Sequence, residues 1–392
     1  MTAPTITPVL PLTESDTEAE IRSAVRRICE SFDIDYARRC HDEGRPPTEL
    51  WRALGDAGFL GLNLPEQWGG GLGMAGLTIV AEEAASTGNY LVMLVVSSAI
   101  NGSVLSTHGT DEQKERWLPG IADGTGPLAF AITEPDAGSN SHQLRTSLRR
   151  EGDGYVLSGQ KVFISGVESA AAILVVARFR DESGELGVPC LCIVDVDAPG
   201  VTRTPIRMPY IGPDKQWQVF FDDVIIARDQ LIGGERGGMR AVFDGLNPER
   251  IIVAALENGV ARQALDKASA YANERTVWKT PIGAHQAVAH RLAKAKVDLE
   301  LARLMTGKAA ALFDAGATDV GAAANIAKYA AAEAAIHSVE AAIQTHGGNG
   351  FAVEQGVSDM WWIARLMRTA PVSADMVLNY VAEHLLGLPK SY

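Results

Sequence analysis

The stretch Phe130-Ala131-Ile132-Thr133-Glu134-Pro135-Asp136-Ala137-Gly138-Ser139 passes from an apolar run into a turn that carries hydroxyl groups on both sides. Such a loop offers backbone N–H groups and side-chain donors to an anionic or carbonyl-rich ligand. Taken alone, the pattern favours a solvated hairpin turn over a binding loop. The stretch also marks a boundary, because the residues before it have mostly helical spacing and those after it have strand signals.

The hydrophobic pattern divides the chain into three regions around this boundary. Residues 1–126 are expected to form a helical domain, in which the nearly continuous apolar run 77–105 indicates a buried helix or pair of helices. Residues 127–235 hold short strand candidates with turns between them, which predicts an antiparallel β-barrel or sandwich. Residues 236–392 return to helical spacing and are rich in alanine, which predicts a tight helical bundle that subunits can share. The predicted fold class is α+β, and mainly α.

Short apolar runs and stripes locate individual elements within these regions. The strand candidates are residues 155–157 and 162–164, expected to form a hairpin around Ser158-Gly159-Gln160-Lys161, followed by residues 173–179, 191–196 and 219–226. Two helical stripes are expected to face the bundle core, the first being Val253, Leu256, Val260 and Leu265, and the second Ile326, Tyr329, Ile336, Val339 and Ile343.

The composition argues against several classes of function. The 392 residues include 35 Lys and Arg against 48 Asp and Glu, so the net charge of −13 argues against binding nucleic acid or an anionic membrane through bulk charge. Four cysteines are too few for a disulfide framework, and Cys190 and Cys192 have no second Cys or His pair nearby to complete a metal site. No apolar segment is long enough for a membrane span. The first 21 residues hold no Lys or Arg, which argues against a targeting leader and makes a cytoplasmic location the expectation.

A second glycine-rich stretch, Gly71-Leu72-Gly73-Met74-Ala75-Gly76, matches the dinucleotide-binding pattern G-x-G-x-x-G. That pattern binds a dinucleotide only where a β-strand precedes it and a helix N-terminus follows it. Here the preceding residues 65–70 have the composition of a loop. We therefore interpret the match as chance and expect no Rossmann domain.

Five motifs occur together in the order that is typical of one family. The stretch 130–139 resembles the T-E-P-x-A-G-S signature of acyl-CoA dehydrogenases. The other four are Gly109-Thr110-Asp111-Glu112-Gln113-Lys114 with Leu118-Pro119, Gly159-Gln160-Lys161-Val162-Phe163-Ile164-Ser165 (G-x-K-x-W-I-T), Arg275 with His285-Gln286 (R-x-x-F-G-x…H-Q), and Gln344-Thr345-His346-Gly347-Gly348-Asn349-Gly350-Phe351 (Q-x-x-G-G-x-G-F). The resemblance covers about residues 18–388, which is almost the whole chain.

The resemblance implies an N-terminal helical domain, a central β domain and a C-terminal four-helix bundle that bind FAD and an acyl-CoA thioester. It implies α,β-dehydrogenation of the acyl-CoA, a step of fatty acid metabolism, with an electron-transferring flavoprotein as electron acceptor. It also implies a homotetramer in which the flavin lies near a dimer interface. No metal is implied, and the sequence does not indicate the acyl group.

Carried over residue by residue, the resemblance implies a cofactor site and a substrate site. The flavin ring would be lined by Phe130, Ile132, Thr133, Gly138 and Ser139 and flanked by Phe163, Ile164 and Ser165, with Thr133 bonded to the ring and the Ser165 hydroxyl near N5. The rest of the FAD would be held by Arg275, Trp278, Gln286, Gln344, Thr345, Gly347, Gly348, Ser373 and Asp375, and the substrate by Ser139, Leu246, Asn247 and Arg250. Phe163 replaces the usual Trp, which changes the surface where an electron acceptor docks.

The base that removes the α-proton has to be a carboxylate in an apolar, water-excluded site. Many family members carry it near the C-terminus in Y-E-G-T, but alignment from Arg368 puts Pro371 there, and Asp375 lies one helical turn further on. The isovaleryl and long-chain types carry the base in an earlier G-L-D-x-E-R segment, which residues 245–250 match except for Asn at position 247. The resemblance therefore implies that Glu249 is the base.

Three alternatives stay open. The segment 245–250 also fits a helix start, with Asn247 as N-cap, Pro248 as first helical residue and Glu249 complementing the helix dipole. Pro371 at the usual position of the base suggests a non-catalytic or heteromeric subunit that serves a partner chain. The same fold also allows an acyl-CoA oxidase or flavin hydroxylase, in which the reduced flavin meets oxygen.

Overall fold

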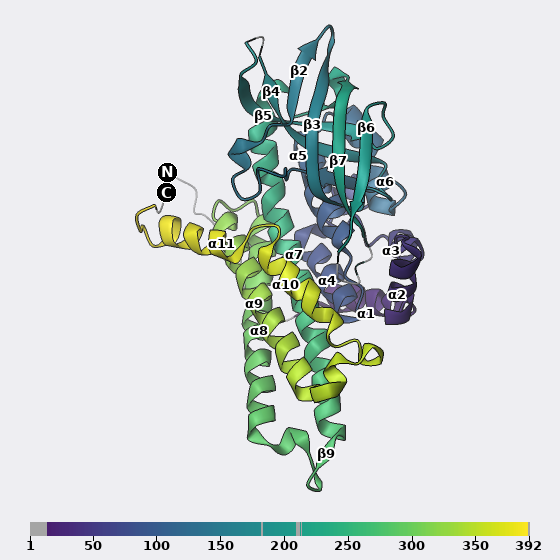
Figure 1. The fold of residues 1–392 in the computed structure, drawn as a ribbon, viewed down its shortest axis with the longest axis vertical. Coiled ribbons are helices and arrows are strands. Elements are labelled where there is room, and N and C mark those ends of the chain that lie inside the picture. The colour runs from purple at the N-terminus through teal and green to yellow at the C-terminus, as the bar shows by residue number, and fades with distance from the viewer. Residues whose placement is uncertain (1–13, 182, 209–211, 213, 391–392) are drawn as a thin grey trace. The chain divides into compact units, whose positions relative to one another are not determined.

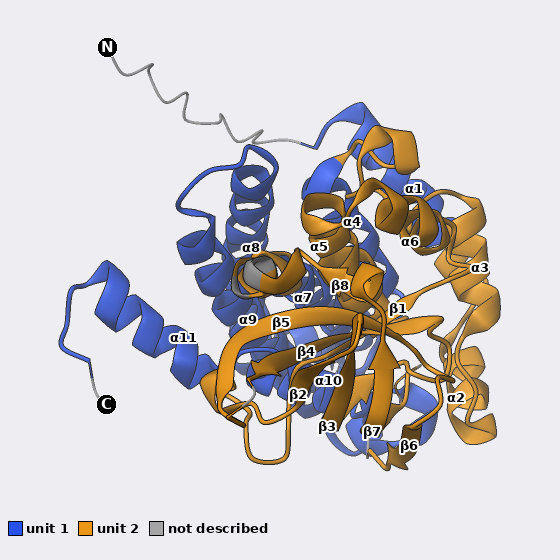
Figure 2. Ribbon diagram, turned by 90° about the horizontal axis from the view of Figure 1, so that it is seen from above, with its two compact units in different colours: residues 1–27, 73–88, 250–392 blue, residues 28–72, 89–249 orange. Residues whose placement is uncertain are grey.

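The computed structural model describes residues 14–390 except 182, 209–211 and 213 (Figure 1). Packing groups the chain into two compact units, of which unit 1 holds residues 1–27, 73–88 and 250–392 and unit 2 holds residues 28–72 and 89–249 (Figure 2). Because these units follow packing rather than chain order, the predicted limits of 1–126, 127–235 and 236–392 stay a prediction. Helices at both ends of the chain and a mostly antiparallel sheet between them confirm the predicted fold class.

The helices of unit 2 come mainly from the first third of the chain. They are α2 (Ile34–Glu43), α3 (Thr48–Asp56), α5 (Gly102–His108) and α6 (Asp111–Asp123), with the 3-10 turns η1 (Glu66–Trp68), η3 (Ser141–Gln143) and η4 (Arg228–Gln230) and the π-helical segment η2 (Leu94–Asn101). The part of α7 (Gly234–Glu274) that ends at residue 249 also belongs to unit 2. Every residue of η2 is buried, as the apolar run predicts. Helix α6 begins at a capping box, in which the side chains of Thr110 and Gln113 bond each other's backbone N–H groups.

The sheet of unit 2 has eight strands in the order β6-β7-β3-β2-β4-β5-β8, with β1 paired to β4 outside this path. The strands are β1 (Leu128–Ala131), β2 (Ser147–Glu151), β3 (Gly154–Ser165), β4 (Ala172–Arg180), β5 (Leu186–Asp195), β6 (Val201–Ile206), β7 (Gln216–Ile226) and β8 (Leu231–Ile232). Most pairs are antiparallel, but β1 and β2 each run parallel to β4, which the sequence pattern does not predict.

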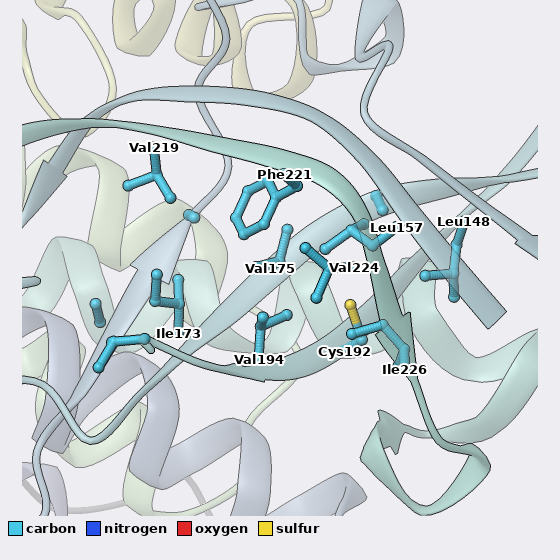
Figure 3. Packing of buried hydrophobic residues seen from close by; sticks show 14 of the residues in the cluster. Leu148, Leu157, Ile173, Val175, Cys192, Val194, Val219, Phe221, Val224 and Ile226 are labelled. Atoms are coloured by element: carbon cyan, nitrogen blue, oxygen red, sulfur yellow. The ribbon is translucent and has the colours of Figure 1, made fainter. Parts of the chain in front are cut away.

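The core of the sheet is built from alternate residues of its long strands. Val175 of β4, Val194 of β5, and Val219, Phe221 and Val224 of β7 point toward one another (Figure 3). Each of these side chains is at most 3% exposed. The predicted strands 173–179, 191–196 and 219–226 are confirmed by β4, β5 and β7, and along β4 and β5 every second residue belongs to this core.

The hairpin predicted around Ser158-Gly159-Gln160-Lys161 is wrong. Residues 154–165 form one strand, β3, and the turn lies earlier, at Gly152, which has a φ of 56°. Gly159 has a φ of 147°, and a Cβ atom there would lie 2.6 Å from the Thr146 hydroxyl oxygen. The register of β3 against β7 also shifts between Leu157 and Gly159. The glycine therefore marks a bulge and a close backbone approach rather than a turn.

Unit 1 is a helical bundle. Its helices are α1 (Asp16–Cys29), α4 (Gly73–Ser86), α8 (Gln286–Asp314), α9 (Val320–His346), α10 (Asp359–Thr369) and α11 (Ala374–Tyr380), together with the part of α7 (Gly234–Glu274) that starts at residue 250. A hairpin of β9 (Thr276–Val277) and β10 (Thr280–Pro281) joins α7 to α8. The unit also holds the 3-10 turns η5 (Ile282–Ala284), η6 (Gly347–Phe351) and η7 (Val353–Gln355) and the π-helical segment η8 (Val381–Leu385). Helices α8 and α9 lie side by side (Figure 1).

The buried face of α9 consists mainly of alanine. Ala324, Ala327 and Ala331 are completely buried, whereas the predicted stripe residues Ile326 and Tyr329 are partly exposed. The α9 stripe is therefore only partly right, since small side chains let this helix approach its neighbours more closely than a row of larger ones would. The stripe predicted on α7 is confirmed, because Val253, Leu256, Val260 and Leu265 are all buried.

The glycine-rich stretch 71–76 opens helix α4, and the structure agrees that it is not a Rossmann motif. The 3-10 turn η1 precedes it in place of a strand. The N–H groups of Met74 and Ala75, at the start of α4, donate to the Asp314 carboxylate at 2.6 and 2.9 Å. The chain's own carboxylate thus occupies the position where such a motif binds a phosphate.

Candidate active site

The loop after β1 and the end of β3 are bonded to each other in unit 2. The Val162 N–H donates to the Thr133 carbonyl at 3.0 Å, and the Lys161 ammonium donates to the Ile132 carbonyl at 2.8 Å. The structure thereby brings together the segments 130–139 and 159–165. These are the two segments that the sequence motifs assign to the two sides of a flavin ring.

A buried ion pair, which the sequence reasoning missed, joins the same two segments. Lys161 Nζ donates to Glu134 Oε1 at 2.8 Å, and the two side chains are 0% and 6% exposed. Burial lowers the pKa of Lys161 to about 8, although Glu134 opposes this effect. Burial raises the pKa of Glu134, but Lys161 outweighs it and holds that pKa below its usual range. The sequence did contain a signal, since a lysine within an apolar strand requires a buried partner.

Phe163 stands out from the sheet at a bulge. The pairing of β3 with β7 steps from Lys161–Val219 to Ile164–Trp217, which leaves one extra residue on β3. Phe163 has a φ of 59°, a left-handed value that is unusual for an aromatic residue, and it is 56% exposed. Bulges often redirect side chains beside active sites, and backbone strain is concentrated there as well. This geometry suits a side chain that faces a ligand.

The residues after Phe163 alternate between the core and the open face. Ile164 is 2% exposed and belongs to the hydrophobic core, so only its main chain remains for a ligand. Ser165 is partly exposed, and its hydroxyl lies against the side-chain amide of Gln216. Of the other predicted ring residues, Phe130 is buried in β1 and Ser139 is exposed.

Open backbone is present at the three glycines that were predicted to meet the cofactor. At Gly138 in unit 2, and at Gly347 and Gly348 in unit 1, no atom lies within 4 Å of the position that a Cβ would take. Gly347 ends helix α9 with a φ of 59°, which favours glycine. Each of these positions leaves room for a ligand to approach the main chain.

A strained hairpin in unit 1 presents an aromatic side chain. Trp278 and Lys279 form the turn between β9 and β10 with φ values of 49° and 71°, where glycine or asparagine is usual. Trp278 is 86% exposed and meets the ring of His285 edge-on, with 6.0 Å between the ring centroids. Arg275, at the start of the hairpin, and Gln286, at the start of α8, are exposed as well. Three predicted cofactor residues therefore lie on one short exposed segment.

The end of α9 offers mainly amide and main-chain groups. The Thr345 hydroxyl donates to the Ala341 carbonyl at 2.7 Å and is buried, so its side chain is already used inside the helix. His346 stacks on Tyr271 with 4.4 Å between the ring centroids, which agrees with a packing role. Gln344 is exposed and lines a groove of about 880 Å³ that α8, α9 and α10 form within unit 1.

Ser373 and Asp375 belong to the start of α11. Ser373 is the N-cap, and its hydroxyl accepts the Met376 N–H at 3.3 Å. Asp375 is exposed in the first helical turn, where a negative charge complements the helix dipole. The carbonyl of Val372, the residue before Ser373, accepts a hydrogen bond from the buried Lys328 ammonium at 2.6 Å. These contacts give both predicted cofactor residues a structural role.

Glu249 lies inside a long helix and not at a helix start. Helix α7 runs unbroken from Gly234 to Glu274 through Pro248, so the interpretation of Asn247 as an N-cap is wrong. Proline has no N–H, which leaves a gap in the backbone hydrogen bonds of α7 one residue before Glu249. The Glu249 side chain is half-buried, as are Leu246, Asn247 and Arg250.

Gly245 lets this part of α7 pack closely against the apolar run of unit 2. A Cβ at Gly245 would lie 2.8 Å from a Val104 methyl group and 3.3 Å from an Ile100 methyl group. The stretch of α7 that leads to Glu249 therefore lies directly against α5 and η2. An apolar wall of this kind suits the surroundings of a carboxylate that acts as a base.

Two further expectations concern metals and membranes. Among the residues that the structure describes, no group of three or more His, Cys, Asp and Glu could hold a metal ion. Burial raises the pKa of the Cys190 thiol to about 12 and also raises that of Cys192, so both stay protonated. Within the same ranges, no helix is both long and apolar enough to cross a membrane. Residues 1–13, on which most of the leader prediction rests, lie outside the described residues.

Comparison with known proteins finds relatives along the whole chain. Models of the acyl-CoA dehydrogenase N-terminal, middle and C-terminal domains match residues 15–125, 129–224 and 236–386. The chain is 51% identical over 383 residues to the acyl-CoA dehydrogenase FadE12 of Mycobacterium tuberculosis strain H37Rv, covering 96% of this chain and 98% of that protein.

Two solved structures share the fold over nearly their full length. The structure of glutaryl-coenzyme A dehydrogenase in complex with glutaryl-CoA is similar with a TM-score of 0.91 and 28% identity, covering 97% of this chain and 98% of that chain. The FAD complex of PigA is similar with a TM-score of 0.89 and 25% identity, covering 96% and 99%.

Proposed function

Because the chain belongs to the acyl-CoA dehydrogenase family, whose members are FAD-containing oxidoreductases, we propose that it converts an acyl-CoA thioester to the trans-2-enoyl-CoA with Glu249 as the base. The α-carbon of the substrate loses a proton to the Glu249 carboxylate, and the β-carbon loses a hydride. Bound FAD supplies the hydride acceptor at N5. One C–C single bond becomes a double bond, and two electrons leave the substrate.

The observation that carries this proposal is the place of Glu249 within helix α7. Because α7 is continuous through Pro248, Glu249 has no role at a helix start, and the packing of Gly245 brings its helix against buried apolar residues. The position near the C-terminus where many family members carry the base is occupied by Pro371, which has no acidic group. Asp375, further along the chain, is exposed on α11. Glu249 is therefore the carboxylate that best suits the α-proton.

The chemistry sets what the site must provide. The α-proton is a weak acid, and it can be removed only if donors polarise the thioester carbonyl as negative charge develops on its oxygen. The carboxylate must also have a pKa lifted by an apolar surrounding, so that it matches this task. Glu249 is half-buried and lies about one helical turn after Gly245, which packs against Val104 and Ile100, and this supports the role.

The residues of the chain fit FAD. A flat ring system needs exposed flat groups against it, and Phe163 and Trp278 are both exposed on strained backbone. Phosphate groups need N–H donors and a guanidinium, which the open glycines 347 and 348 and the exposed Arg275 can offer. We assign the ring to the segments around Thr133 and Ser165, and the pyrophosphate and adenosine to the hairpin and the end of α9.

We also propose that the chain works as a homotetramer. Helix α8 exposes Val297, Leu301 and Leu304, which are 58–62% exposed and lie on one face at helical spacing. Together with the exposed Trp278, they give unit 1 more exposed apolar surface than single scattered apolar residues would give. A second copy would cover this surface and would let Arg275 and Trp278 serve the flavin of the neighbouring subunit. An electron-transferring flavoprotein is the proposed electron acceptor.

The test is an anaerobic titration of the FAD-bound protein with acyl-CoA thioesters of different length and branching, followed through the flavin absorbance. The wild-type protein is expected to bleach with its own substrate. Glu249→Gln keeps the FAD but bleaches about 10²–10⁴-fold more slowly, because the general base is gone. Glu185→Gln, an exposed glutamate outside the predicted site, is the matched control, and it is expected to bleach at the wild-type rate.

Each other outcome points to a named alternative. Bleaching of Glu249→Gln at the wild-type rate would rule out Glu249 as the base. Wild-type protein that carries no FAD, or that purifies in a fixed ratio with a second chain, would favour the non-catalytic or heteromeric subunit. Fast reoxidation of the bleached flavin in air would favour an oxidase or a flavin hydroxylase.

A further inference from the structure

Ser165 and Gln216 are direct neighbours across two strands. They pair in the register of β3 and β7, so their side chains lie on the same face of the sheet. Gln216 Nε2 donates to Ser165 Oγ at 2.8 Å, and the Ser165 hydroxyl can donate to Gln216 Oε1 at the longer distance of 3.2 Å. Gln216 is 7% exposed, and Ser165 is more open. The shorter contact is the one in which the amide is the donor.

A second set of bonds fixes this pair in place. The Gly166 N–H donates to the Lys215 carbonyl at 3.0 Å. The Glu168 carboxylate accepts the Lys215 N–H at 2.8 Å and the Trp217 indole N–H at 2.5 Å. The residues that follow Ser165 are thus bonded to both neighbours of Gln216. These bonds fix the backbone on both sides of the pair, so that the two side chains stay next to each other.

A hydroxyl group has one hydrogen to donate and two lone pairs that accept. When the Gln216 amide donates to Ser165 Oγ, it takes one lone pair, and the hydroxyl hydrogen can then point either to Gln216 Oε1 at 3.2 Å or away from the strand to a closer acceptor on a ligand. If the amide oxygen faced Ser165 instead, that hydrogen would be used inside the protein. Gln216 therefore decides whether Ser165 is a donor on the open face.

We propose that Gln216 is a positioning residue that turns the Ser165 hydroxyl hydrogen toward the bound flavin. The inference rests on the proposed function, which places Ser165 near N5. In oxidised flavin N5 accepts a hydrogen bond, whereas in reduced flavin it carries a hydrogen of its own. A donor that Gln216 holds in place favours the oxidised form, so its loss makes the flavin easier to reduce.

The test is a double-mutant cycle read from the reduction potential of the bound flavin, measured against reference dyes without substrate. Ser165→Ala and Gln216→Met are each expected to shift the balance about tenfold toward reduced flavin, which corresponds to about 30 mV for two electrons. The reduction potential of the double variant is expected to shift by the same amount as that of each single variant, and not by the sum, because each change removes the same hydrogen bond to the flavin. Ser165→Thr keeps the hydroxyl and should keep the wild-type potential.

A matched control lies two residues along the same strand. Gln218 bonds its amide to Gln160 Oε1 at 3.2 Å, away from the Ser165 pair. Gln218→Met is expected to leave the potential unchanged. Thermal unfolding of all variants shows whether Gln216→Met acts on the flavin or merely loosens the sheet, since a structural role would lower the melting temperature and leave the potential of the remaining holoprotein in place.

The outcomes separate the inference from the function on which it rests. If Ser165→Ala shifts the potential but Gln216→Met does not, or if the two shifts add, Gln216 does not orient Ser165. If Ser165→Ala has no effect, the placement of Ser165 at the flavin is wrong. If Gln216→Met does not fold, Gln216→Glu replaces it, since a carboxylate must take the Ser165 hydrogen itself, and the cycle with Ser165→Ala has to be non-additive again.

Discussion

Two glutamates of unit 1 are equally buried and are held in opposite ways. Glu83 on α4 and Glu257 on α7 are both 0% exposed. Glu83 meets Arg22 at 2.9 Å, Arg26 at 2.5 Å and Arg262 at 2.9 Å. Neither carboxylate oxygen of Glu257 has a hydrogen-bond partner among the described residues.

The difference shows that partners, and not burial alone, decide the charge of a buried acid. Burial raises the pKa of Glu83, but Arg22 and Arg262 outweigh it and hold that pKa below its usual range. Burial raises the pKa of Glu257 well above its usual range, and Lys328 opposes this only in part. We therefore expect Glu83 to be charged and to link α1, α4 and α7, and Glu257 to be a neutral acid within the bundle.

The largest effect is expected from Glu83→Gln. This change leaves Arg22, Arg26 and Arg262 around a neutral amide. Arg22 and Arg262 keep Glu82 as a second partner, so the loss is expected at the lower end of the roughly 3–5 kcal/mol that breaking a buried ion pair costs, at about 3 kcal/mol. Urea unfolding of the FAD-bound protein at pH 7 measures the loss. Because the pKa of Glu83 is lowered in the folded state, its contribution is present above about pH 4.3 and is lost as the pH falls. The difference in the free energy of unfolding between Glu83→Gln and the wild type should therefore become smaller at acidic pH.

The matched control is an exposed glutamate of the same unit. Glu274→Gln, at the end of α7, changes the same chemical group on the surface and is expected to stay within about 0.5 kcal/mol of the wild type. If Glu83→Gln were as harmless as this control, the arginines around Glu83 would not hold α1 and α4 in unit 1.

The next effect is expected from Glu257→Gln and has the opposite sign. The folded wild type must keep Glu257 protonated, while the unfolded chain releases that proton above about pH 4.3. The wild type therefore loses stability relative to the amide as the pH rises, by about 1.4 kcal/mol per pH unit up to the raised pKa. Urea unfolding at pH 5, 6 and 7 should show that the free energy of unfolding of Glu257→Gln increases relative to that of the wild type at each step.

A flat difference across this pH range would contradict the comparison. It would mean that Glu257 is charged in the folded protein and is paired with Lys328, as Glu83 is paired with its arginines. In that case Glu257→Gln would be destabilising at every pH, because it would leave Lys328 as a buried charge without its counter-ion. Lys328→Met tests the same point from the other side.

The sequence predicts the fold well where the pattern of apolar residues along a segment indicates one kind of element. The strands around 173–179 and 219–226 and the buried stripe of α7 follow a clear pattern, and the structure has them where expected. The hairpin around Gly159 fails because a glycine in a strand marks either a turn or a bulge, and only the partner strand decides which. The parallel pairing of β1 with β4 depends on contacts that no local pattern contains.

The candidate site divides in the same way. Motifs identify the segments around Thr133 and Ser165, but they do not show that Ile164 faces the core while Phe163 faces outward, since this follows from the bulge. The pair of Glu134 and Lys161 joins residues far apart in the chain, so local spacing cannot reveal it. The alternative of a helix start at Asn247 is wrong because Asn247, Pro248 and Glu249 have the composition of a helix start but lie inside α7.

The smallest effect is expected at a third carboxylate of unit 1, which extends the comparison of the two buried glutamates to an exposed acid. Asp314 is exposed but accepts the N–H groups of Met74 and Ala75 at the start of α4. Asp314→Ala removes this cap and should cost about 1 kcal/mol in urea unfolding, whereas Asp314→Asn keeps one acceptor oxygen and should cost less. A loss as large as that of Glu83→Gln would show that α4 depends on its first turn as much as on its buried charge, and the two glutamates would then differ less in kind than their surroundings indicate.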